Sequence, residues 1–126
     1  MRVLVADRQA SVRYALKVLL LRQKRLTLVG EADTLISLVE QMRQLQPDLI
    51  LLDWELPGMR GSSSIAVLRE LNPQLTIIAM SGQPGVRHEA VAAGVNGFIP
   101  KTEPPDRLLE LLKHYESQAG DIQPQL

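Results

Sequence analysis

Four polar side chains that could do chemistry each lie just beyond a short apolar run. Asp7 follows the run 3–6, Asp53 follows 49–52, Ser81 follows 75–80, and Lys101 lies two residues after 97–99. Two carboxylates held close together repel each other unless a cation lies between them, and oxygen ligands with room for water suit Mg²⁺. A lysine and a hydroxyl are groups that hold a phosphoryl. One of the carboxylates could therefore accept a phosphoryl group.

The elements that must bring these side chains together are strands alternating with helices. Apolar runs without polar alternation occur at 3–6, 26–30, 49–52, 75–80 and 97–99, which is typical of strands buried on both faces. Apolar residues at helical spacing lie between them, at 12–19, 35–42, 65–71 and 108–115, while 84–94 is alanine-rich and less periodic. We predict an α/β fold, a five-stranded parallel sheet in the order 2-1-3-4-5, doubly wound with five helices.

In such a sheet, ligands bind beyond the carboxyl ends of the strands where the strand order reverses, which is where the four polar residues would meet. Residues that are common at helix ends support the predicted helices. Ser11 and the serines at 62–64 are candidate N-caps, and Gly94 suits the position after a helix end. We expect one domain at 1–117 and a polar tail, or the start of a linker, at 118–126.

Composition excludes several classes of function. There is no cysteine and only four aromatic side chains, which excludes thiolate metal sites and base-stacking platforms. No apolar run is long enough for a signal peptide or a membrane span, so a cytoplasmic protein is expected. The net charge of zero argues against direct binding of nucleic acid or an anionic membrane. Residues 1–25 nevertheless hold seven basic side chains and one acid, or +6, against −6 in the remainder.

The segment 51–61, Leu-Leu-Asp-Trp-Glu-Leu-Pro-Gly-Met-Arg-Gly, resembles the phosphorylation segment of CheY-like receiver domains of two-component response regulators. Met80-Ser81-Gly82 and Phe98-Ile99-Pro100-Lys101 extend the resemblance, which covers residues 2 to about 115. The stretches 30–32 and 93–98 are most similar to receivers attached to LuxR-type helix-turn-helix domains.

The resemblance implies a role for each residue. Asp53 is the phosphoacceptor, Asp7 is an acid of a Mg²⁺ site, and Lys101 binds the phosphate. Ser81 is the hydroxyl that follows the phosphoryl group, and Phe98 is the aromatic that changes rotamer with it. Such a domain is a switch and not an enzyme, with self-phosphorylation and self-dephosphorylation as its only reactions.

One residue departs from the family pattern. The family has two consecutive acids after the first strand, but here Asp7 is followed by Arg8. With Asp53 and Lys101 included, this changes the net charge of the site at the sheet edge, called the rim below, from −2 to zero. Charges about 4 Å apart interact by about 4 kcal/mol at an effective dielectric of 20, so Mg²⁺ binding and phosphorylation should weaken. Three outcomes remain open: Glu55 lends the missing carboxylate, the Arg8 guanidinium takes the place of the cation beside Asp53, or Arg8 turns to solvent and leaves a weaker site.

The resemblance also implies partners. A histidine kinase would donate the phosphoryl group, and a DNA-binding output domain, absent from this chain, would follow the tail. The predicted first helix carries basic residues and an apolar stripe of Tyr14, Val18 and Leu21. With the helix at 108–115, it is the surface through which LuxR-type receivers form a homodimer.

Two rival functions remain. One is a pseudo-receiver, a phosphorylation-independent interaction module held in one state by Arg8. The other is a flavodoxin-like FMN binder, although Asp7-Arg8-Gln9-Ala10 stands where a Ser/Thr-Gly phosphate loop would be needed. The sequence also leaves the Lys101–Thr102 peptide open. Many relatives have a cis bond to proline there, and a cis bond without proline costs about 2.5–4 kcal/mol.

Overall fold

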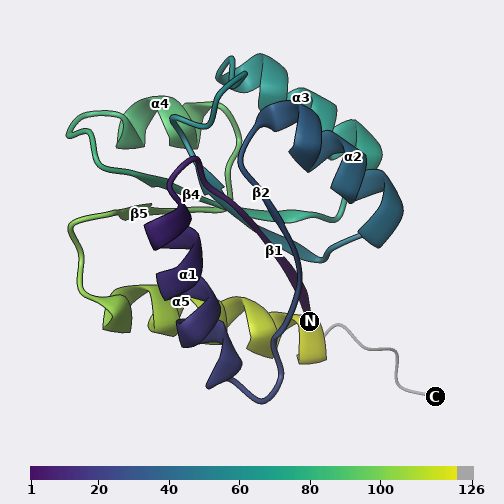
Figure 1. Cartoon of the computed structure of the whole chain (residues 1–126), viewed down its shortest axis with the longest axis vertical. Coiled ribbons are helices and arrows are strands. Elements are labelled where there is room, and N and C mark those ends of the chain that lie inside the picture. The colour runs from purple at the N-terminus through teal and green to yellow at the C-terminus, as the bar shows by residue number, and fades with distance from the viewer. Residues whose placement is uncertain (122–126) are drawn as a thin grey trace.

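Five short strands and five helices alternate along the chain in the computed structural model, which describes residues 1–121 (Figure 1). The strands are β1 (Arg2–Ala6), β2 (Thr27–Ala32), β3 (Leu49–Asp53), β4 (Thr76–Ser81) and β5 (Gly97–Pro100). The helices are α1 (Ala10–Leu21), α2 (Leu35–Leu45), α3 (Ser62–Leu71), α4 (Arg87–Ala92) and α5 (Pro105–Asp121). No helix among these is long and apolar enough to cross a membrane.

All strand pairs are parallel and the sheet order is β2-β1-β3-β4-β5, which confirms the predicted fold. Helices α2, α3 and α4 cover one face of the sheet, and α1 and α5 cover the other (Figure 1). The order reverses between β1 and β3, so the carboxyl ends of these two strands open one crevice.

The core forms two aliphatic layers because side chains alternate across each strand. Leu4 and Ile50 face the layer that α2, α3 and α4 complete. Val5 and Leu51 face the layer completed by α1 and α5. Both sets are almost fully buried, which explains why the strands read as continuous apolar runs rather than alternating ones.

The ends of the helices differ in part from the predictions. Gly94 has φ +103° directly after Ala93, the C-cap of α4, as predicted. Ser11 is not an N-cap: Gln9 occupies that position, and its N–H donates to Asp7 Oδ1 at 2.8 Å. Helix α5 continues to Asp121, into the segment predicted to be a tail, and residues 122–126 lie outside the described part of the chain.

Candidate functional site

The four side chains singled out from the sequence meet at the carboxyl edge of the sheet. Asp53 and Ser81 end β3 and β4, and Asp7 and Lys101 directly follow β1 and β5. Asp7 and Asp53 are only 2% and 1% exposed, so their charges are removed from water and need partners within the protein.

Lys101 supplies the nearest positive charge to both carboxylates. Its Nζ lies 2.9 Å from Asp7 Oδ2 and 3.3 Å from Asp53 Oδ1. Neither Lys101 Nζ nor Asp7 Oδ2 completes a hydrogen bond of good angle within the described residues, so the short contact is an ion pair with hydrogen-bonding capacity to spare. This buried ammonium can therefore donate to a further oxygen atom.

Arg8 lies on the other oxygen of Asp53. Its backbone N–H donates to Asp53 Oδ2 at 3.2 Å, and its side-chain Nε is 3.7 Å from the same oxygen. The Arg8 side chain is 49% exposed, so about half of it remains in contact with water. Asp53 Oδ1 also accepts the Glu55 N–H at 2.9 Å. Asp53 is thus flanked by one cation on each oxygen.

The Glu55 side chain turns to Ser81. Ser81 Oγ lies 2.9 Å and 2.8 Å from the two carboxylate oxygens of Glu55, and it accepts the Gln83 N–H at 3.0 Å. Both the hydroxyl hydrogen and a lone pair of Ser81 are therefore in use. The carboxylate that the sequence suggested as a replacement metal ligand is held by this hydroxyl.

The residues present do not fit a resident Mg²⁺. Mg²⁺ needs near-octahedral oxygen ligands, usually one or two carboxylates with waters. Here Asp7, Asp53, Arg8 and Lys101 sum to zero charge, and both carboxylates already have an ammonium within 3.3 Å. Among the described residues, no three acidic or histidine side chains form a group that could hold a metal ion.

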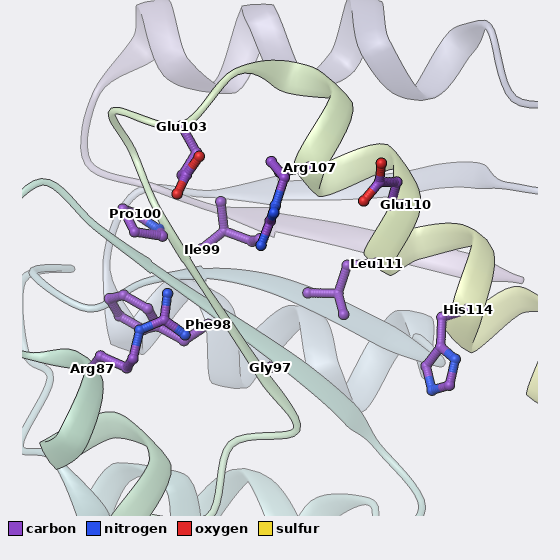
Figure 2. Close-up of a pocket in the computed structure, with 10 residues that line it drawn as sticks. All are labelled: Arg87, Gly97, Phe98, Ile99, Pro100, Glu103, Arg107, Glu110, Leu111 and His114. Atoms are coloured by element: carbon purple, nitrogen blue, oxygen red, sulfur yellow. The ribbon is translucent and has the colours of Figure 1, made fainter.

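Phe98 lies on β5 beside this rim, 8% exposed, with the guanidinium carbon of Arg87 5.0 Å from its ring centroid. Figure 2 shows Arg87 against the ring at one end of a surface hollow of about 360 Å³ between β5 and α5. A second hollow, also about 360 Å³, reaches from Phe98 to Ser81. Space therefore adjoins both residues that the resemblance assigns to switching.

Several contacts were not predicted from the sequence. Arg13 donates from its side chain to the Asp7 carbonyl at 2.7 Å, and the Trp54 indole N–H donates to Glu89 of α4 at 3.4 Å. The second pair has no local sequence signal, because Trp54 and Glu89 are 35 residues apart. The described residues contain no cis peptide, so the Lys101–Thr102 bond is trans.

Comparison with known proteins gives consistent matches. A family model described as the response regulator receiver domain matches residues 3–113. Chemotaxis protein CheY of Thermotoga maritima is 34% identical over 88% of this chain and 93% of its own length. The Escherichia coli nitrate/nitrite response regulator NarL is 31% identical over 95% of this chain, which spans 56% of that protein. The signal receiver domain of a Mycobacterium tuberculosis NarL superposes with a TM-score of 0.81 at 25% identity, covering 92% of this chain and 95% of that one.

Proposed function

Because the chain belongs to the response regulator receiver domain family, we propose that Asp53 accepts a phosphoryl group from the phosphohistidine of a histidine kinase. The family acts in two-component signalling as a switch. The family assignment sets the flavin-binding alternative aside. Action in the cytoplasm is part of the same proposal.

The observation that carries the proposal is the pairing of a buried carboxylate with a cation that still has donor capacity. Asp53 ends the central strand β3, and Lys101 Nζ is 3.3 Å from its Oδ1. An ammonium there neutralises charge as the phosphoryl group arrives and donates to a phosphoryl oxygen afterwards. Ser81, on the neighbouring strand, provides a neutral donor at the same edge.

In the transfer, one carboxylate oxygen of Asp53 attacks phosphorus and forms an acyl phosphate. The bond between phosphorus and the imidazole nitrogen breaks, and its electron pair stays on the histidine of the kinase. Ser81 then exchanges its Glu55 contact for a phosphoryl oxygen, and Phe98 moves with it. The surface of α4, β5 and α5 shifts between two populations, which an output domain such as a DNA-binding domain would read.

The test is phosphorylation of the chain by acetyl phosphate, measured by intact mass. We expect one added phosphoryl group on wild type and none on Asp53→Asn. The variant keeps the shape and hydrogen-bond acceptor of the aspartate, so its loss of phosphorylation would not reflect a lost fold. Circular dichroism of both proteins checks this.

The second candidate function is a pseudo-receiver, and the Arg8 contact with Asp53 favours it. The Arg8 guanidinium, with its Nε 3.7 Å from Asp53 Oδ2, would hold the acceptor in one ion-paired arrangement without any phosphoryl group. In that case the domain would act as an interaction module in one fixed state. Absence of phosphorylation with acetyl phosphate, both with and without Mg²⁺, would favour this function over the first.

Receivers generally bind Mg²⁺ for phosphorylation. In this chain Arg8 replaces an acid, so we expect Mg²⁺ to bind weakly and to have little effect on phosphorylation. Trp54, which is the only tryptophan and follows Asp53 directly, can report Mg²⁺ binding by fluorescence. A normal saturable response to Mg²⁺ would contradict the expectation.

A further inference from the structure

We propose that Arg8 and Lys101 together form a metal-independent phosphoryl site on Asp53, in which the Arg8 guanidinium does the work of a divalent cation. The inference rests on the proposed function, because it concerns the same acceptor. It goes further by naming the residue that replaces the metal and by predicting that the reaction proceeds without one.

The two cations approach Asp53 from different oxygens. Lys101 Nζ is 3.3 Å from Oδ1, and Arg8 Nε is 3.7 Å from Oδ2. The Arg8 backbone N–H is bound to Oδ2 at 3.2 Å, which fixes the start of the side chain beside the acceptor. A phosphoryl group bonded to either oxygen therefore arrives next to a positive side chain.

The chemistry of the two side chains suits a phosphoryl group. Guanidinium presents paired N–H donors that match two phosphoryl oxygens, and ammonium acts as a point charge. Arg8 is half exposed and can turn toward an incoming donor, whereas Lys101 is largely buried and fixed by Asp7. Lys101 Nζ also retains unused hydrogen-bonding capacity. Lys101 is thus held in place before the phosphoryl group arrives, whereas Arg8 can adjust its position to it.

The charges at the rim point the same way. Asp7 and Lys101 neutralise each other at 2.9 Å, which leaves Arg8 facing Asp53. Glu55, the remaining acid nearby, is held by the Ser81 hydroxyl. A divalent cation would have to displace or approach two positive side chains. A phosphoryl group brings negative charge that the same two side chains stabilise.

With acetyl phosphate the step balances without any metal or proton donor. An Asp53 oxygen forms a bond to phosphorus, the bond from phosphorus to the bridging oxygen breaks, and acetate leaves with the electron pair. Nothing is oxidised or reduced. Arg8 and Lys101 contact the phosphoryl oxygens during transfer, so Arg8 would be a catalytic residue.

The experiment measures the phosphorylation rate of chelator-treated protein with acetyl phosphate, in EDTA and in saturating Mg²⁺. We expect wild-type rates that agree within about twofold, since no metal takes part. Arg8→Ala should lose about tenfold or more in EDTA because it loses a charge-assisted contact, and Arg8→Lys should retain part of the rate. Arg8→Asp, which restores the family's acid, should depend on Mg²⁺ by about tenfold or more. Arg43→Ala, an exposed arginine on α2, serves as the control.

A wild-type reaction that requires Mg²⁺, or an Arg8→Ala rate in EDTA equal to that of wild type, would overturn the inference. If wild type accepts no phosphoryl group under either condition, the proposed function fails separately. The Arg8 site is then decided by titrating beryllofluoride into Mg²⁺-free protein, followed by Trp54 fluorescence. Binding that Arg8→Ala weakens supports the site, and no binding overturns it.

Discussion

The Ser81 hydroxyl has one hydrogen, which it donates to the Glu55 carboxylate in a hydrogen bond. With the oxygens of Glu55 at 2.9 Å and 2.8 Å, the hydroxyl cannot also donate to a group on Asp53. Glu55 therefore competes directly with a phosphoryl group for Ser81. The contact with Glu55 must be broken before Ser81 can bind a phosphoryl oxygen. Glu55 therefore raises the free energy needed to reach the switched state.

Removing this competitor should favour the switched state. We expect Glu55→Ala to bind beryllofluoride about fivefold more tightly than wild type, in line with about 1 kcal/mol for one hydrogen bond that no longer has to be broken. Fluorescence of Trp54 measures the affinity. Glu70→Ala, an exposed glutamate on α3, should bind as wild type does. Weaker binding by Glu55→Ala would mean that Glu55 supports the bound state instead.

At the scale of elements, the contact between β5 and α5 depends on a missing side chain. A Cβ added to Gly97 would lie 2.9 Å from Leu111 Cδ2, closer than side chains normally approach. The glycine lets α5 pack directly against β5, and β5 carries Phe98. Leu111 packs in the same core layer as Ile99, whereas Phe98 faces the other layer, so this close approach sets the packing of α5 on its own face of the sheet.

We expect Gly97→Ala to destabilise the domain by about 1–3 kcal/mol, the usual cost of overpacking. Urea unfolding followed by circular dichroism measures the change. Gly82→Ala is the matched control, because no atom lies within 4 Å of a Cβ added there, and it should change stability by less than about 0.5 kcal/mol. Equal effects of the two substitutions would show that packing against Leu111 is not the cause.

Helix α5 is also tied to the sheet by Tyr115, whose hydroxyl donates to the Asn96 carbonyl at 2.7 Å. Burial raises the pKa of Tyr115 above its ordinary value of 10.0. The folded state therefore keeps this proton to higher pH than the unfolded chain does. The stabilisation is fully present below pH 10 and is lost as the pH rises through the folded-state pKa.

Tyr115→Phe should cost about 0.5–1.5 kcal/mol near neutral pH, the worth of one hydrogen bond. It should also remove this part of the fall in stability in alkaline solution. The free energy of unfolding measured in urea on both sides of pH 10 tests both statements. Tyr14→Phe, which changes the only other tyrosine, lies at an exposed position of α1 and should leave the alkaline profile unchanged.

For the whole molecule, the basic first segment of the chain meets α5 on one side of the sheet. Helix α1 carries exposed Lys17 and is followed by exposed Arg22, whereas α5 carries exposed charges of both signs, Asp106 and Glu110 beside Arg107 and Lys113. The ion pair between Arg25 and Glu116, at 3.7 Å, joins the segment after α1 to α5 on one side of the sheet. The basic residues of α1 therefore lie beside a helix of mixed charge, an arrangement that suits pairing of two copies through α1 and α5.

If two copies pair in this way, exposed Leu21 on α1 is part of the contact. We expect Leu21→Glu to abolish self-association in analytical ultracentrifugation and salt near 1 M to weaken it, since the Debye length falls to about 3 Å. Ile36→Glu, at an equally exposed position on α2, should have no effect. Association that survives Leu21→Glu would place the dimer elsewhere.

The sheet could be predicted because its central strands β1, β3 and β4 are buried on both faces, so that each forms a nearly uninterrupted apolar run in the sequence. Asp7, Asp53, Ser81 and Lys101 were predictable for the same reason, since each lies at or directly after the end of a strand. The direction of the Glu55 side chain was not, because it depends on Ser81, 26 residues away. The contact of Arg8 with Asp53 likewise depends on the pairing of β1 with β3, and the sequence left it open.

Helix α4 differs from the rest of the fold in a way that bears on exchange of its amide hydrogens. It has six residues, buries only Ala90, and lies between Gly85 and Gly94, which both have positive φ. The residues of β3, in contrast, are at most 1% exposed. Amides of α4 should therefore exchange with deuterium by local opening while those of β3 exchange only on global unfolding. A signal that begins with phosphorylation of Asp53 on β3, a strand that opens only on global unfolding, would thus reach α4, a helix that opens locally at low free-energy cost.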